Sequence, residues 1–203
     1  MKVSDPGIDE TVIVSANDLS VLMAFSNTCT WTTYNYGRDE LRNYPTFPVT
    51  VQGKNYTKYM RDSGTGDLPE VIIYSGSKSD SNIPRSAWGY LDSWTDQHQI
   101  SAYTTMRTVI KWWKDTFGRD SLDGKGMTVN LVTHASDMSD NACWSSGSET
   151  ISVGDIGNSS LYDHTRAIGL DTLAHETGHA VLYYVTGGIP YRNATVTATP
   201  RQA

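Results

Sequence analysis

The stretch from Asp96 to Phe117 constrains the fold of this chain more than any other, because its apolar residues recur at helical spacing over about six turns. Thr95 or Asp96 is suited to cap such a helix, and Gly118 follows its last turn. The apolar positions, three or four residues apart, are Ile100, Tyr103, Met106, Val109, Ile110 and Trp113. One long helix must therefore bury an apolar face against the rest of the chain.

The segments around this helix have the alternation and turn residues that are typical of strands. Residues 9–26 predict a hairpin around the turn sequence ANDL, whereas residues 28–46 are interpreted as a linker or an irregular strand. Further strands are predicted within residues 48–62, 70–75 and 127–135, and a pair of short strands within 141–155. The chain is therefore predicted to be α+β, with a mostly antiparallel β region ahead of the long helix.

A second helix is predicted near the end of the chain. It should begin between Asp163 and Ala167 and end near Thr186, because two glycines follow. Its expected apolar stripe is Leu170, Ala174, Val181 and Val185, continued by Thr177 and Tyr184. The neighbouring face carries Asp171, His175, Gly178, His179 and Leu182. A glycine in mid-helix costs roughly 1 kcal/mol relative to alanine, so Gly178 needs an explanation.

Composition narrows the class of protein. The 203 residues carry a net charge of -6, which argues against a nucleic-acid partner, and no apolar run is long enough to span a bilayer. The start MKVSDPG lacks the apolar segment of a signal peptide, so either the protein is cytosolic or its true N-terminus is missing. Cys29 and Cys143 allow one disulfide, or free or buried thiols.

The segment HETGH, residues 175–179, places two histidines one helical turn apart on the same face. Their ring nitrogens can share one Zn²⁺ at about 2.0 to 2.1 Å. Glu176 projects about 100 degrees round the helix, where it can act as a base without ligating the metal. The alternative is an amphipathic helix with two solvated or core histidines and no metal.

A zinc site needs a third protein ligand. One known pattern requires Gly and His where Leu182 and Val185 stand, so that class is excluded. The other takes a glutamate from a helix about twenty residues downstream, but no Asp or Glu follows His179. The third ligand is therefore absent from this sequence.

Four stretches in the right order resemble the thermolysin-like neutral metallopeptidases, which are zinc endopeptidases of the gluzincin type. WWKDTFGRDSLDGKG (residues 112–126), NACWSSGSETISVGD (141–155) and GLDTLAHETGHAV (169–181) are similar to the end of the family's long helix, its edge strand and its zinc-binding helix. A looser similarity covers residues 58–75 and 82–94. Residues 1–27 resemble the last hairpin of the family's propeptide, which implies a zymogen; an unrelated hairpin is the alternative.

The resemblance implies a role for each matching residue. His175 and His179 become zinc ligands, and Glu176 becomes the general base that activates a zinc-bound water for peptide hydrolysis. Asn141, by its side chain, and Ala142, by its main chain, hold the substrate as an added strand. Asp171 matches a position that helps to bind Ca²⁺ in the family; a solvated carboxylate, or one that supports His175, is the alternative.

The sequence also departs from the family pattern. After Asn193, the tail ATVTATPRQA (residues 194–203) does not match the family's glutamate-bearing helix, and we expect the helical C-terminal domain to be missing. Residues 28–193 then form the N-terminal part of a secreted catalytic domain with peptide or protein substrates, and little activity is expected from it alone. The alternative is an inactive module that binds peptides or inhibits. No membrane or nucleic-acid partner is expected in either case. A structural protein with a fortuitous histidine pair is the third reading.

Overall fold

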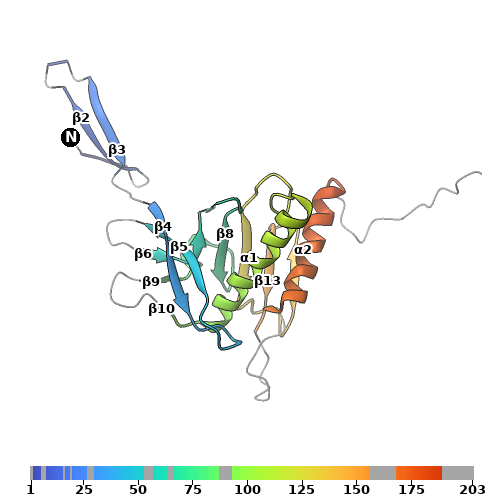
Figure 1. Cartoon of the computed structure of the whole chain (residues 1–203). Coiled ribbons are helices and arrows are strands. Elements are labelled where there is room, and N and C mark those ends of the chain that lie inside the picture. Colours follow the sequence, from blue (N-terminus) through green and yellow to red (C-terminus); the bar gives the residue numbers. More distant parts are fainter. Residues whose placement is uncertain are drawn as a thin grey trace, which may run out of the picture.

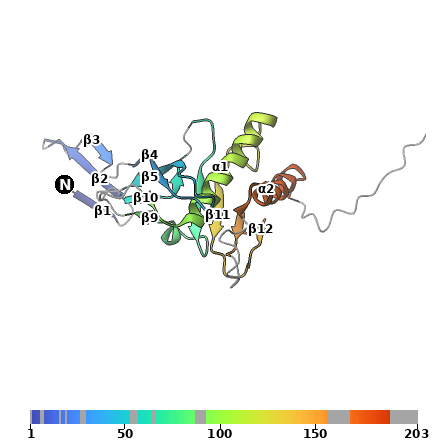
Figure 2. The same ribbon diagram turned by 60° about the horizontal axis from the view of Figure 1, so that its bottom comes forward.

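The computed structural model describes residues 2–5, 8–15, 17–18, 20–26, 30–52, 57–63, 66–86, 93–155 and 168–188. They form three β-sheets and two α-helices, together with a short 3-10 helix η1 (Asp80–Asn82), which confirms the predicted α+β class. Helix α1 runs between the second sheet and helix α2 (Figures 1 and 2). Neither described helix is long and apolar enough to cross a membrane.

The first sheet is antiparallel and contains the strands β1 (Lys2–Asp5), β2 (Ile8–Val14) and β3 (Val21–Ser26) in that order. The β2–β3 hairpin confirms the prediction for residues 9–26, and β1 is an additional strand. Figure 1 shows this sheet apart from the main body. The predicted boundaries at residues 27–28 and 193–194 lie outside the described residues.

The second sheet has the order β10-β4-β5-β6-β9. Its strands are β4 (Thr30–Gly37), β5 (Thr46–Gln52), β6 (Thr57–Tyr59), β9 (Arg85–Ser86) and β10 (Ser93–Trp94). Strand β4 pairs with β5 along its whole central part, so the interpretation of residues 28–46 as a linker or irregular strand is wrong for this segment. The pattern was hidden because Tyr34 and Tyr36 are exposed while Asn35 between them is 1% exposed, the reverse of the usual alternation.

The third sheet has the order β12-β13-β11-β8-β7. Its three central strands, β8 (Val71–Ser75), β11 (Val129–Thr133) and β13 (Thr150–Val153), are parallel, whereas β7 (Arg61–Asp62) and β12 (Ala142–Ser145) are antiparallel edges. Every residue of β11 is buried, as predicted. The carboxyl ends of β11 and β13 meet at one edge of the sheet, which brings the residues after them together.

Helix α1 (Gln97–Phe117) confirms the long helix. The Asp96 side chain accepts a hydrogen bond from the Gln99 N–H, and Gly118 ends the helix in the left-handed conformation at φ 63°. The Tyr103 hydroxyl donates to the Pro48 carbonyl at 3.0 Å and so ties the helix to strand β5. The most buried α1 residues are Ile100, Ala102, Tyr103, Met106, Val109 and Ile110, which form the centre of the main core.

Helix α2 (Leu170–Val185) begins later than predicted, because Gly169 has a non-helical ψ of 150° and acts as the N-cap. The predicted apolar stripe is also partly wrong, since Leu170 and Val185 are 56% and 65% exposed. The buried residues of α2 are Leu173, Glu176, Thr177, Ala180 and Val181. The helix packs against both α1 and β12, so its buried arc follows these two neighbours rather than the most apolar positions.

A candidate metal centre on helix α2

Thr177 fixes the rotation of helix α2. Its side chain is fully buried, its hydroxyl donates to the Leu173 carbonyl at 2.7 Å, and it also contacts the Met106 sulfur of α1 at 3.9 Å. Because residue 177 faces α1, the positions two residues before and after it point away from that contact. The two histidines of the HETGH segment are therefore presented on the open side of the helix.

The imidazoles of His175 and His179 converge on each other. Their Nε2 atoms lie 2.9 Å apart, and the ring centroids are separated by 4.5 Å at an interplanar angle of 88°. Two nitrogen ligands of a tetrahedral Zn²⁺ lie about 3.4 Å apart, so a small opening of the pair accommodates the ion. The donor set therefore fits a zinc ion. It is also accessible from solvent, because His175 is exposed and His179 is half-buried.

Glu176 lies between helix α2 and the edge strand β12. It is 8% exposed, and its Oε2 accepts a hydrogen bond from the backbone N–H of Trp144 at 2.8 Å. One ligand atom from each of His175, Glu176 and His179 lies within 4.8 Å of the others, so the carboxylate is held beside the histidine pair. The sequence predicted the glutamate, but not the strand amide that anchors it.

Strand β12 offers main-chain groups at this site. In the antiparallel pairing with β13, every second residue of β12 directs its backbone N–H and C=O to the partner strand. The residue before β12 follows this alternation, since the Asn141 carbonyl accepts a hydrogen bond from the Gly154 N–H. The Trp144 N–H points the other way, to Glu176, and Ala142 shares this outward direction because it stands two residues earlier. Asn141 is exposed next to this edge.

Asp171 and Cys143 lie outside the ligand group of His175, Glu176 and His179. Asp171 is exposed in the first turn of α2, four residues before His175, and is not part of the 4.8 Å ligand group among the described residues. Cys143 is a half-buried free thiol, and its pKa is raised by burial and by the nearby charges of Glu176 and Asp137. Cys29 lies outside the described residues.

A second group of potential metal ligands was not predicted from the sequence. It consists of His98, His134 and Asp155, again with one ligand atom from each within 4.8 Å of the others. The available signal was the position of His134 directly after the buried strand β11, at the carboxyl end of a parallel sheet.

Comparison with known proteins defines the class. Residues 34–183 match the family model described as thermolysin metallopeptidase, catalytic domain. The chain belongs to this metallopeptidase family. Among its relatives, a bacillolysin of Brevibacillus brevis is 28% identical over 158 residues, 77% of this chain and 28% of the relative. A thermolysin of Bacillus sp. (strain EA1) is 26% identical over 165 residues, or 79% and 29% of the two chains.

The chain therefore spans less than a third of the length of these relatives. Among solved structures, the precursor of protealysin, a metalloproteinase from Serratia proteamaculans, aligns with a TM-score of 0.46 at 19% identity. The alignment covers 60% of this chain and 37% of that one.

Proposed function

We propose that this chain carries the zinc-binding helix and the substrate-binding edge strand of a thermolysin-type endopeptidase. The observation that carries the proposal is the position of Glu176, which is held beside the converged His175 and His179 by the Trp144 amide. This arrangement joins two metal ligands, a base and a strand edge within one small region.

His175 and His179 are the residues that would hold Zn²⁺, and a bound zinc ion would supply a Lewis acid that polarises the scissile carbonyl. A catalytic zinc site uses three protein ligands and keeps a further position open. The part of the chain that the structure describes adds no further His, Cys, Asp or Glu to the group of His175, Glu176 and His179. We therefore expect weak zinc binding and slow cleavage from the 203-residue chain alone.

Glu176 is proposed as the general base. It takes a proton from the water whose oxygen attacks the carbonyl carbon, and it delivers that proton to the nitrogen when the C–N bond breaks. The low exposure of Glu176 limits the access of bulk water to its carboxylate. The Trp144 N–H binds Oε2, which leaves Oε1 for the proton transfer. The substrate is a peptide, which the outward edge of β12 binds as an added strand through Ala142 and the Asn141 side chain.

The remaining assignments are proposals by family membership. Residues 1–27 are proposed as the end of a propeptide and residues 28–193 as part of the catalytic domain, from a secreted enzyme made as a zymogen. For Asp171, two roles are proposed: a carboxylate that supports His175, or a ligand to Ca²⁺.

The test compares the chain with H175A/H179A and with E176Q, using H164A as a control because His164 is the other histidine near this helix in sequence. Equilibrium titration with Zn²⁺ should show one binding equivalent fewer in H175A/H179A only. Cleavage of a quenched fluorogenic peptide at high protein concentration should be absent in E176Q. Equal cleavage by the chain and E176Q contradicts the catalytic proposal. Peptide binding without any cleavage favours the alternative, a non-catalytic module that captures extended peptides on β12.

A further inference from the structure

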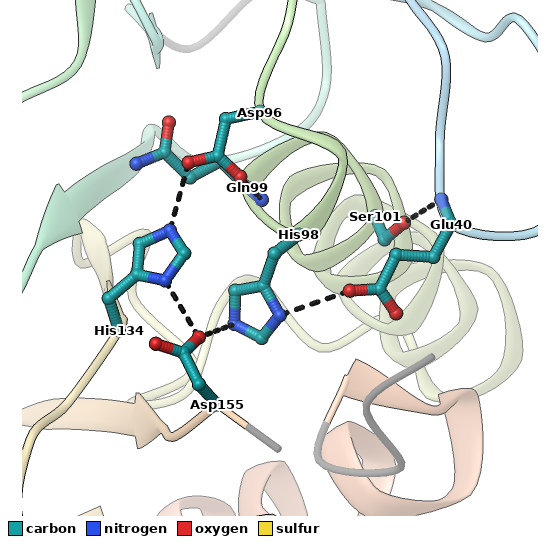
Figure 3. Close-up of polar contacts among 7 residues, drawn as sticks. All are labelled: Glu40, Asp96, His98, Gln99, Ser101, His134 and Asp155. Atoms are coloured by element: carbon teal, nitrogen blue, oxygen red, sulfur yellow. Dashed lines mark hydrogen bonds and ion pairs between the residues drawn. The ribbon is translucent and has the colours of Figure 1, made fainter. Parts of the chain in front are cut away.

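Five charged or titratable side chains gather where the carboxyl ends of β11 and β13 meet the first turn of α1. Figure 3 shows His134 and Asp155 below the start of the helix, with Asp96 and His98 on the helix side and Glu40 reaching in from the connection between β4 and β5. None of these residues belongs to the centre on helix α2. The group draws together four segments of the chain.

His98 is the buried member of this group, at 7% exposure. Its Nδ1 lies 3.3 Å from Oε1 of Glu40. Its Nε2 is buried without a hydrogen-bond partner among the described residues and faces Oδ1 of Asp155 at 3.8 Å, beyond hydrogen-bond range. A buried nitrogen left without a partner is unusual in a native protein and calls for an explanation such as an ion.

His134 is the second nitrogen donor. Its Nε2 lies 2.9 Å from Oδ2 of Asp96, and its Nδ1 lies 2.7 Å from Oδ1 of Asp155. The residue has a φ of 55°, in the left-handed region that residues other than glycine seldom adopt. Strained backbone of this kind concentrates at functional positions. The two ring centroids lie 4.8 Å apart.

The strand ends that carry these residues are tied together. The Ala135 N–H donates to Val153 at 3.0 Å, and the Asp140 N–H donates to the Asp155 carbonyl at 2.7 Å. A side chain at Gly154 is excluded, because its Cβ would lie 1.8 Å from the Met138 carbonyl oxygen. The backbone from Val153 to Asp155 is therefore held against the loop that follows His134.

We propose that His98 Nε2, His134 Nδ1 and Asp155 Oδ1 form a second metal site, for a divalent transition-metal ion of the zinc type. Two imidazole nitrogens and one carboxylate oxygen are a ligand set that such ions prefer, and they leave a position open for water. The second nitrogen of each histidine lies against a carboxylate, Glu40 for His98 and Asp96 for His134. This pairing is the usual outer support of metal-bound histidine, because it fixes the ring and its tautomer.

The charges around the site favour a cation. Three carboxylates, those of Glu40, Asp96 and Asp155, face the two imidazoles. A metal ion replaces the proton on His134 Nδ1, which leaves to solvent. Asp155 has a side chain that is 55% exposed, so the ion can enter from its side. The alternative is that the proton stays on His134 Nδ1 and no metal ion binds. The group would then be a network of ion pairs.

The test removes the first site and asks whether a metal still binds. In the H175A/H179A chain, titration with Co²⁺ should saturate at one equivalent, with the visible absorption of nitrogen-ligated cobalt. H134A and D155N, each added to this background, should lower the affinity at least about 10-fold, and E40Q and D96N by about 10- to 100-fold. His164 is the one histidine of the chain that belongs to neither proposed site, so H164A should leave the affinity for Co²⁺ unchanged.

Far-UV circular dichroism of each variant separates loss of ligands from loss of fold, and D155N decides the case if H134A does not fold, because Asp155 is largely exposed. As a second readout, Zn²⁺ should raise the melting temperature of H175A/H179A but not that of H175A/H179A/D155N. The proposal is overturned if H175A/H179A does not bind Co²⁺. It is also overturned if adding H134A or D155N to this background leaves the affinity for Co²⁺ unchanged. Either result leaves the function proposed for helix α2 untouched, since that site is absent from all these variants.

Discussion

The backbone N–H of Trp144 donates a hydrogen bond to Oε2 of Glu176 across 2.8 Å and so joins the edge strand β12 to helix α2. A hydrogen bond to a charged acceptor contributes about 1.5 to 3 kcal/mol to stability, and Glu176 is nearly buried. One side chain thus serves both the proposed chemistry and the docking of a strand.

The two roles of Glu176 are separable by substitution. We expect E176A to lower the free energy of unfolding by about 1 to 3 kcal/mol, because the Trp144 amide loses its acceptor. E176Q keeps an acceptor oxygen and should lose less, although both variants should lack cleavage. Urea unfolding in the presence of a chelator measures the difference without metal. Equal stability of E176A and E176Q would show that the hydrogen bond does not hold the strand.

Gly178 stands in the middle of helix α2 without a steric reason. A Cβ added there meets no heavy atom within 4 Å, and the residue is not among the positive-φ glycines. We therefore expect G178A to raise the free energy of unfolding by roughly 1 kcal/mol. Zinc content should stay unchanged because the side chains of His175 and His179 are not displaced. G154A is the opposite control, since its Cβ would overlap Met138, and it should destabilise the chain.

Local periodicity explains which elements were predictable. Helix α1 and the buried strand β11 each carry their pattern within one segment, so the sequence alone was sufficient. Strand β4 was missed because Tyr34 and Tyr36 are exposed aromatic residues and Asn35 between them is buried. The rotation of α2 was misjudged because its neighbours, α1 and β12, are distant in sequence and leave no local signal.

The same distinction applies to the sites. His175, Glu176 and His179 lie in one helical turn, so their spacing could be recognised directly. His134 and Asp155 are 21 residues apart and meet only because β11 and β13 are parallel neighbours. The register of those strands was not readable from the sequence, so the second ligand group became visible only in the fold.

Asp62 and Arg107 form an ion pair that joins strand β7 to helix α1, with the aspartate side chain fully buried. Removal of one partner from a buried ion pair takes away much of the compensation of the other charge, so R107M should destabilise the chain by up to about 3 to 5 kcal/mol. D62N/R107M should be clearly more stable than the sum of the single changes predicts. The exposed pair of Lys111 and Asp115 on the same helix is a matched control, and K111A should cost no more than about 0.5 kcal/mol. Additive single effects in urea unfolding would contradict the pairing.

Cys143 should react slowly with alkylating reagents. Its pKa is raised first by burial and then by the charge of Glu176, and only the thiolate is nucleophilic. In a C29S background, the rate of iodoacetamide alkylation should therefore rise at higher pH in the native chain than in urea. E176Q should move the native curve back towards lower pH, because it removes one of the negative charges that disfavour the thiolate. Coincident native and unfolded curves would mean that the fold does not suppress ionisation of Cys143, and an unshifted E176Q curve would mean that the carboxylate does not act on it.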